Sequence, residues 1–154
     1  MKGIEALLAE HPFFHGLAPE YVELIAGCGS NVAFNEGEYV FHQGEPANRF
    51  YIIRHGLVQL QIFVPHRGPL AIETVREGEV FGWSWLFPPY TWSLDAQAIQ
   101  QTRAVALDGA CLRRKCDEDP KLGYELMKRF APIIIERLNS TRLRLLDIYG
   151  RAPA

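Results

Sequence analysis

The sequence lacks the features that would place it in a membrane or outside the cell. It contains no apolar run near the roughly 20 residues that a membrane-spanning helix needs. Residues 1–14 carry acidic side chains in place of the apolar core of a signal peptide. The three cysteines, Cys28, Cys111 and Cys116, cannot all pair, so we expect buried free thiols and no secreted disulfide scaffold. A soluble protein of the reducing cytoplasm, with no membrane partner, is therefore the expectation.

The chain also lacks an excess of positive charge. Its 16 Lys and Arg and 18 Asp and Glu give a formal net charge of −2, whereas domains that bind nucleic acid through bulk charge are usually strongly basic. The net charge changes from −6 over residues 1–102 to +4 over residues 103–154. Because the basic part falls on a predicted helix, we interpret it as a solvated helix face.

The side-chain patterns of common catalytic and metal sites are missing as well. The histidines form no His-x-His pair, and Cys111 and Cys116 form no CxxC motif. No Gly-x-Ser-x-Gly, Walker or dinucleotide motif occurs. We therefore expect no catalytic residues, no metal ion and no cofactor. An enzyme would require a bound metal with His42, His55 or His66 as ligands.

What the sequence does contain is a β-rich part between two helical parts. Residues 1–30 are predicted as short helices, residues 31–107 as strands separated by glycine-bearing turns, and residues 108–149 as helices. The alternation of apolar residues over Leu57–Val64 is typical of a half-buried strand. Many short runs at this spacing favour an antiparallel sandwich or jelly roll. The predicted runs are Val32–Phe34, Tyr39–Phe41, Phe50–Ile53, Leu57–Val64, Leu70–Val75, Leu94–Ile99 and Ala104–Leu107.

Two capping signals predict the helices that follow. Asp108 is a candidate N-cap for a short helix, and Asp119 before Pro120 marks the start of a long helix that runs to about residue 148. Pro132 lies inside this long helix and predicts a kink or a break there.

An apolar seam follows Pro132 on the same predicted helix. Its residues repeat at heptad-like spacing, which is typical of helices that pack together: Ile134, Leu138, Thr141, Leu145 and Ile148. The seam packs either on the chain's own strands or on a second copy of the chain. Because neighbouring residues are also apolar, we favour a homodimer through residues 132–148.

Taken in order, these elements resemble the cyclic nucleotide-binding domain of the cAMP receptor protein and FNR-type (CRP/FNR) regulators. The resemblance covers about residues 10–149 and implies one mainly β domain with flanking α helices over residues 1–154, a jelly-roll (double-stranded β-helix) with a long C-terminal helix. It is carried by an ordered series of short motifs: Pro12-Phe13-Phe14, Gly16-Leu17, Phe34, Gly37-Glu38, Val40-Phe41, Gln43-Gly44-Glu45, Tyr51-Ile52-Ile53 and Gly56.

The DNA-binding part of such regulators is not expected here. In the family, a winged helix-turn-helix domain follows the long helix, and the few residues after Asp147 are too short for one. Direct DNA binding is therefore not expected of a complete chain. A fragment of a larger regulator remains an open alternative.

In this family the ligand lies on a phosphate-binding cassette, which corresponds to residues 78–96 here. Within that stretch Phe81, Gly82 and Leu86 match the family's pattern. The family's ribose-binding glutamate falls on Trp83, and its phosphate-binding arginine falls on Trp92.

The cassette therefore departs from the family's binding chemistry. Leu94 and Asp95 stand where the family has alanine and then threonine or serine, and no Arg or Lys occurs between Arg76 and Arg103. A buried anion without its cationic partner loses roughly 3–5 kcal/mol, which is two to three decades of affinity. An inward-facing Asp95 would add repulsion.

Aromatic residues are concentrated in the cassette, which holds all three tryptophans: Trp83, Trp85 and Trp92. These rings either fill the pocket as a core or form flat walls around an uncharged or cationic ligand. Ser84 and Ser93 either orient that ligand or cap local turns. An open cavity favours the ligand, and a packed one favours the filled pocket.

We expect a sensor of the CRP/FNR type that binds a small ligand other than ordinary cAMP or cGMP. Its signal would pass through the C-terminal helix, around Pro132, to an unidentified partner protein. One alternative is a dimeric protein-interaction module with a tryptophan-filled pocket; another is the effector domain of a truncated regulator that does bind cyclic nucleotide. The expected ligand-binding residues are Phe81, Gly82, Trp83, Ser84, Trp85, Trp92, Ser93, Leu94 and Asp95.

Overall fold

The computed structural model describes residues 3–150, except for the side chains of Arg144 and of residues 148–150. The helices, with two short 3₁₀ helices written η, and the strands follow in the order α1 (Ile4–Glu10), η1 (Pro12–Phe14), α2 (Pro19–Ala26), β1 (Gly29–Phe34), β2 (Tyr39–Phe41), β3 (Arg49–His55), β4 (Leu57–Val64), β5 (Gly68–Arg76), β6 (Val80–Phe81), η2 (Trp83–Leu86), β7 (Asp95–Ala98), β8 (Thr102–Asp108), α3 (Gly109–Glu118) and α4 (Pro120–Gly150).

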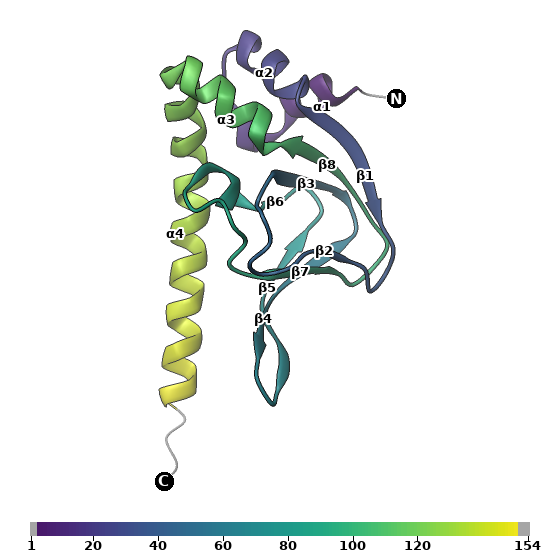
Figure 1. The fold of residues 1–154 in the computed structure, drawn as a ribbon, viewed down its shortest axis with the longest axis vertical. Coiled ribbons are helices and arrows are strands. Elements are labelled where there is room, and N and C mark those ends of the chain that lie inside the picture. The colour runs from purple at the N-terminus through teal and green to yellow at the C-terminus, as the bar shows by residue number, and fades with distance from the viewer. Residues whose placement is uncertain (1–2, 151–154) are drawn as a thin grey trace.

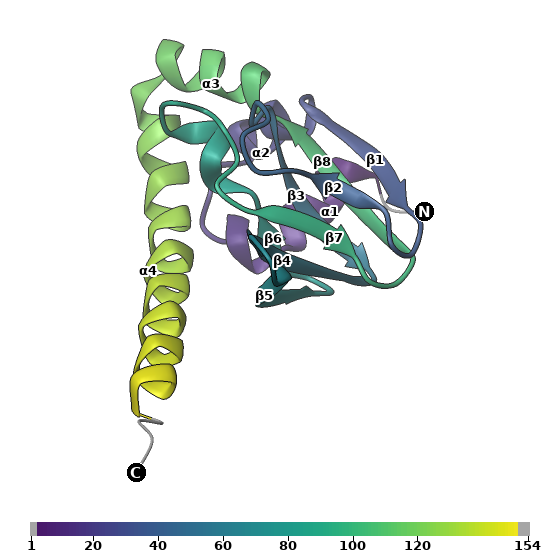
Figure 2. The ribbon, with the colours of Figure 1, turned by 60° about the horizontal axis from the view of Figure 1, so that its bottom comes forward.

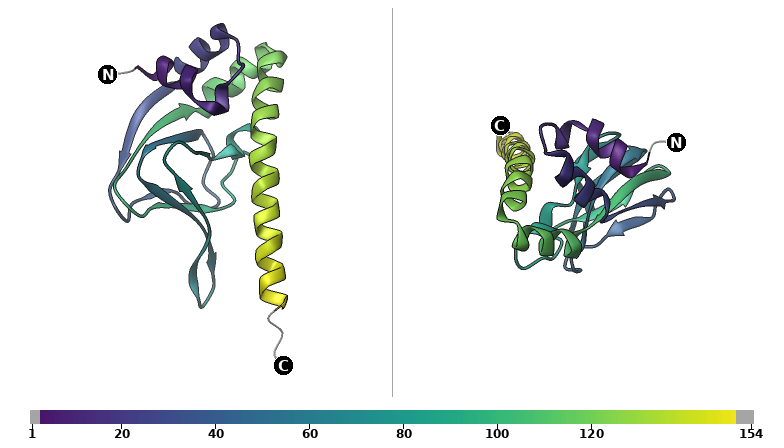
Figure 3. Two further views of the ribbon diagram at one scale, coloured as in Figure 1. Left: turned by 180° about the vertical axis from the view of Figure 1, so that it is seen from behind. Right: turned by 90° about the horizontal axis from the view of Figure 1, so that it is seen from above.

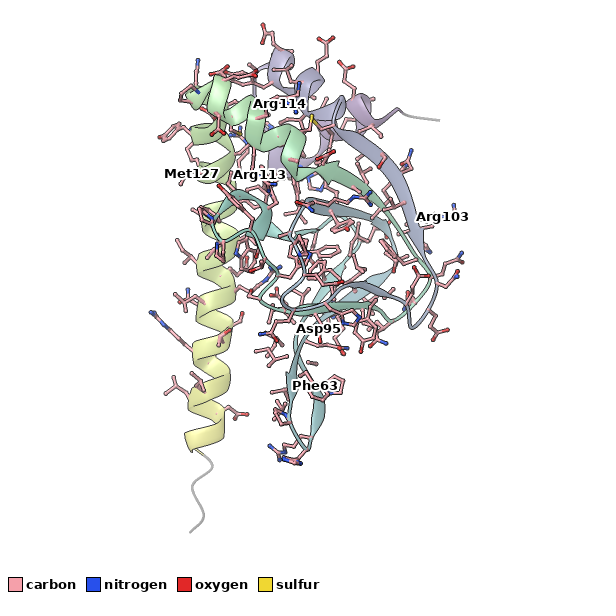
Figure 4. The ribbon with its side chains drawn as sticks, viewed as in Figure 1. Phe63, Asp95, Arg103, Arg113, Arg114 and Met127 are labelled. Carbon is pink, nitrogen blue, oxygen red and sulfur yellow. A yellow bond between two sulfur atoms is a disulfide. The ribbon has the colours of Figure 1, made fainter. Side chains whose placement is uncertain are left out.

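The strands form two four-stranded antiparallel sheets with the orders β1-β8-β3-β6 and β2-β7-β4-β5. The N-terminal helices and α3 cover one end of this β-roll, and α4 runs along one side of it (Figures 1 and 2). The β4–β5 hairpin, with Phe63 on it (Figure 4), and α4 extend beyond the other strands in the same direction (Figure 3). The expectation of a mainly β jelly roll with flanking helices is confirmed.

Each of the seven predicted runs falls on a strand, and only β6 was not anticipated. This strand is too short for alternation to reveal it, because it has only two residues, Val80 and Phe81. Its pairing with β3, in which Phe81 lies opposite Tyr51, is set by the fold around it.

Two apolar cores lie on opposite faces of β3. Phe50 and Ile52 face the helices, whereas Tyr51 and Ile53 face the interior of the roll. Because successive side chains of a strand point to opposite faces, a strand between two cores is apolar at every central position. The short segment Phe50–Ile53 therefore contributes side chains to both cores and joins the helices to the roll.

Both capping predictions for the C-terminal helices are confirmed. The Asp108 carboxylate accepts a hydrogen bond from the Cys111 backbone N–H at 3.0 Å, at the start of α3. The Asp119 carboxylate accepts from the Lys121 backbone N–H at 3.1 Å, and from the Tyr21 hydroxyl at 2.8 Å. Asp119 thus both starts α4 and ties it to α2.

Of the kink or break expected at Pro132, the break is wrong, because α4 is one helix of 31 residues that contains this proline. Pro132 is exposed, so the carbonyl group that loses its N–H partner to the proline ring can bond to water instead. Within residues 3–150, no helix is long and apolar enough to cross a membrane.

The expectation of free thiols is wrong for two of the three cysteines, because Cys28 and Cys111 form a disulfide with their Cα atoms 6.1 Å apart. It is visible as the yellow bond in Figure 4. Cys28 precedes β1, and Cys111 lies in α3, directly after β8. Since β1 pairs with β8, the sheet brings together two residues that are 83 positions apart. Cys116 is free, and burial raises the pKa of its thiol from 9.0 to about 11.

Candidate ligand-binding site

The cassette, residues 78–96, comprises β6, η2 and the loop that leads into β7. Figures 1 and 2 show this segment between the roll and α4. Gly82 directs the chain from β6 into η2 with a φ of +95°, a left-handed backbone conformation that residues with a Cβ atom rarely adopt. The match of Gly82 to the family pattern therefore has a structural cause.

The cavity inside the cassette has a volume of only about 20 Å³. Such a space holds about one water molecule, whereas pockets for drug-sized ligands have roughly 300–1,000 Å³. The lining combines six of the expected site residues with three others: Phe41, Leu60, Gly82, Trp83, Ser84, Trp92, Ser93, Leu94 and Arg137. The pocket is thus packed in this conformation.

Trp92 accounts for most of this packing. Its ring lies parallel to that of Phe41, with the centroids 3.7 Å apart and an angle of 7° between the planes. A Cβ atom added at Gly82 would lie only 3.0 Å from the Trp92 ring. The indole therefore fills the space in front of Gly82, and only 6% of Trp92 is exposed.

The Trp92–Phe41 pair also separates the small cavity from a second, more open space of about 300 Å³. Arg49, Tyr51 and Pro46 are among the residues that line this second space. Burial raises the pKa of the Tyr51 hydroxyl, so this group stays neutral at ordinary pH.

Three of the expected site residues do not line the small cavity. Trp85 lies in the core next to the helices, where its ring stacks on Phe50 with a centroid distance of 5.3 Å. Phe81 belongs to the core of the roll and stacks on Tyr51 at 5.0 Å. The structure therefore distributes the aromatic cluster over two cores instead of one pocket.

Asp95 is the third of these residues, and it does not add repulsion inside the cavity. The Gln43 backbone N–H donates to its carboxylate at 2.7 Å, and the His42 ring lies 3.6 Å from it. Ala96 and Ala98 are the buried residues of β7, so Asp95 occupies the opposite face of the strand (Figure 4).

Arg137 of α4 supplies the cation that the cassette itself lacks. Its guanidinium carbon lies 4.6 Å from the centre of the Trp83 ring, which is within the range of a cation–π interaction. Its Nε atom donates to the Glu73 carboxylate on β5. Arg137 is only 8% exposed, so this ion pair links α4, the cassette and β5.

Arg137 was not predicted as a site residue because it lies outside the cassette, far along the chain from the cation-free stretch between Arg76 and Arg103. A signal was present in the spacing of α4. The buried residues Leu122, Leu126 and Phe130 mark one face of the helix, and steps of three and four residues continue that face through Ile133 to Arg137. A basic residue on such a face is expected to be paired.

Arg113 of α3, labelled in Figure 4, holds the cassette from another side. Its Nη1 atom donates to the backbone carbonyls of Trp85 at 2.5 Å and of Ala47 at 3.3 Å. Its guanidinium also lies 4.5 Å from the centre of the Tyr90 ring. Both ends of η2 are therefore connected to helices by arginines, Arg113 and Arg137.

No group of three or more His, Cys, Asp or Glu residues in the described part of the chain is arranged to hold a metal ion.

Comparison with known sequences points to a regulatory family. The sequence profile of the cyclic nucleotide-binding domain family matches residues 31–119. A CRP-like cAMP-activated global transcriptional regulator of Mycobacterium tuberculosis is 27% identical over 145 residues, which are 94% of this chain and 63% of that protein. The cyclic AMP receptor protein of Thermus thermophilus is 33% identical over 98 residues, 62% of this chain and 44% of that protein. The chain thus spans less than two thirds of the length of these relatives.

Comparison with solved structures agrees. A structure from Geobacter metallireducens superposes with a TM-score of 0.78 and 29% sequence identity, covering 90% of this chain and 99% of that one. The catabolite activator protein of Thermus thermophilus superposes with a TM-score of 0.70 and 26% identity, covering 90% of this chain and 63% of that one.

Proposed function

Because the chain belongs to the cyclic nucleotide-binding domain family, we propose that it is a regulatory domain that does not bind ordinary cAMP or cGMP in its cassette and that signals through α4. One observation carries this proposal. The resemblance to the family aligns Trp92 with the phosphate-binding arginine, and the Trp92 ring fills the space in front of Gly82. A cyclic nucleotide would meet an aromatic ring where it requires both room and a cation.

The electrostatics support the same conclusion. Arg137 is the cation on the cavity, and its guanidinium is already engaged by Glu73 and Trp83. A cyclic phosphate would have to displace both Trp92 and Glu73. An enclosed phosphate without its own cationic partner loses roughly two to three decades of affinity, which corresponds to about 3–5 kcal/mol.

Thermal unfolding in the presence of nucleotide tests this proposal. A ligand that binds only the native state at 100 times its Kd stabilises that state by about 2.7 kcal/mol, which raises the Tm of a domain of this size by roughly 5–11 °C. We expect no shift at millimolar cAMP or cGMP. A shift of several degrees at micromolar nucleotide would refute the proposal and favour the effector domain of a cyclic-nucleotide regulator.

Two functions of the cassette are compatible with this proposal: an interaction module whose pocket is filled by its own side chains, and a site for a small ligand that is not a nucleotide. The cavity of about 20 Å³ is packed, which favours the interaction module with a pocket filled by its own side chains. The polar groups on the same cavity, Arg137, Ser84 and Ser93, favour a small ligand that is not a nucleotide. Both forms require that the output pass through α4 to a second chain.

The exposed face of α4 supports a homodimer as the way in which this output is read. Ile135, Leu138 and Leu145 are 56%, 48% and 49% exposed, and Thr141 of the predicted seam is exposed too. The strands therefore leave most of the seam uncovered, although Ile134 is partly buried. Ile148, its last predicted residue, has a side chain outside the described part. A second copy of α4 would cover this face by heptad-like packing.

Sedimentation equilibrium tests the dimer. Leu138→Glu and Leu145→Glu place charges on the seam, and we expect each to shift the chain toward a monomer. Leu143→Glu is the matched control, because Leu143 is 66% exposed and lies about 140° around the helix from Leu138. A wild-type monomer at high micromolar concentration would exclude the homodimer.

A further inference from the structure

Arg137 has hydrogen-bonding capacity that the chain itself does not use. Its side chain is 9% exposed, and its Nε atom donates to Glu73. Within residues 3–150, neither of its two terminal nitrogens makes a hydrogen bond. These nitrogens carry four N–H donors, and they belong to a residue that lines the cassette cavity. Both nitrogens retain some contact with solvent, so a ligand that enters the cavity can reach their N–H groups.

The groups around this guanidinium complete an environment for an anion. Ser84 and Ser93 line the same cavity, and neither hydroxyl has a hydrogen-bond partner in the described part of the chain. Trp83 and Trp92 form the aromatic part of the lining, whereas Ser93 is exposed, so this side of the site is open to solvent. The site thus offers cationic donors and two hydroxyls beside aromatic rings.

The chemistry of these groups selects the ligand. A planar guanidinium binds carboxylate and phosphate oxygens through paired, charge-assisted hydrogen bonds. The contact with Glu73 already provides one such oxyanion from the chain itself. The volume of about 20 Å³ holds about one water molecule, so an oxyanion fits only by taking the place of the Glu73 carboxylate, and a nucleoside is excluded in this conformation.

We propose that Arg137, together with Ser84 and Ser93, forms a binding site for a small oxyanion, a carboxylate or a phosphate group, which competes with Glu73 for the guanidinium. The inference rests on the proposed function only for its output through α4. Among the described side chains of residues 131–147, Arg137 is the one that is buried. An oxyanion that takes the place of Glu73 therefore changes the principal contact between this half of α4 and the roll.

Titration with potassium phosphate and with potassium acetate, at constant ionic strength maintained with potassium chloride, tests the site. Tryptophan fluorescence is the readout, because Trp83 lies under the guanidinium. We expect a saturable change. A response to phosphate alone identifies a phosphate ligand, and a response to acetate alone identifies a carboxylate. Calorimetry under the same conditions measures the affinity.

Three variants separate this site from a general effect of charge. Glu73→Gln removes the competing carboxylate while keeping its shape, so binding tightens by about tenfold or more. Arg137→Lys keeps the charge but loses the planar fork, so binding weakens by about tenfold. Arg142→Gln is the matched control, because Arg142 is exposed on the same helix, and its affinity stays at the wild-type value.

Two results would overturn the inference. One is no saturable response of the Glu73→Gln variant to either anion at about 100 mM, which is 100 times a millimolar Kd. The other is an equal loss of binding in Arg137→Lys and Arg142→Gln, with both variants folded by circular dichroism. Either result leaves intact the proposal that the cassette does not bind ordinary cyclic nucleotides. Micromolar binding of cAMP would refute that proposal, but it would not show whether Arg137 binds a small oxyanion.

Discussion

Removal of the Trp92 side chain should create a large defect inside the roll. A tryptophan buries about 150–250 Å², which at 25 cal/mol per Å² corresponds to roughly 4–6 kcal/mol as an upper bound. Core Trp→Ala substitutions cost about 3–5 kcal/mol. Because Trp92 also borders the more open space of about 300 Å³, water can enter part of the defect. We therefore expect Trp92→Ala to cost about 3 kcal/mol, near the lower end of that range.

Urea unfolding followed by circular dichroism measures this loss, and a Tm decrease of about 6–12 °C should accompany it. Trp92→Phe keeps an aromatic partner for Phe41 and should recover part of the loss. Trp83→Ala is the comparison at a half-buried position, and it should cost less than Trp92→Ala. Added indole should restabilise only the Trp92→Ala variant, by binding in the vacated space.

A loss below about 1 kcal/mol for Trp92→Ala would refute this reasoning, because a side chain that fills a core cannot be removed so cheaply. Equal losses for Trp92→Ala and Trp83→Ala would also contradict it. In either case the cassette would have more room than the structure describes, and a larger ligand would become plausible.

Three further predictions concern the cysteines, the pH dependence and the capping of α3. Without a reductant, the native chain should show one reactive thiol, that of Cys116. Burial raises the pKa of this thiol to about 11, so at pH 8 iodoacetamide should alkylate it about a hundredfold more slowly than a thiol with a pKa of 9.0. The hydrogen bond from Arg129 lowers the pKa of Glu125 below 4.5, so its stabilisation is present above the pKa of an unfolded glutamate and is lost as the pH falls through the folded value. The stability difference between wild type and Glu125→Gln in urea should therefore be constant near pH 7 and shrink as the pH falls below about 4.5. Asp108→Ala removes the cap of α3 and should lower the free energy of unfolding by about 1 kcal/mol, whereas no change would show that this cap contributes nothing.

The strands and the caps could be predicted because their signals are local. Alternation over Leu57–Val64 and the Asp119-Pro120 pair each depend on neighbouring residues alone. The break at Pro132 was wrongly predicted because the helix continues on both sides of the exposed proline, where the carbonyl without an N–H partner can bond to water.

The site was only partly predictable because its composition depends on how the chain turns. Trp85 and Trp92 are close in sequence, but the turn at Gly82 and the helix η2 send one ring to the helical core and the other to the roll. The disulfide and the Arg137–Glu73 pair join residues 83 and 64 positions apart. Contacts of that range leave no local signal.

The central claim is that Trp92 and the absence of a cassette arginine keep ordinary cyclic nucleotides out. The most direct measurement is an intrinsic fluorescence titration with cAMP and cGMP, because all three tryptophans lie in the cassette. We predict no saturable change up to millimolar nucleotide. A saturable change at micromolar cAMP or cGMP would contradict the claim and show that the Trp92 ring moves aside for the ligand.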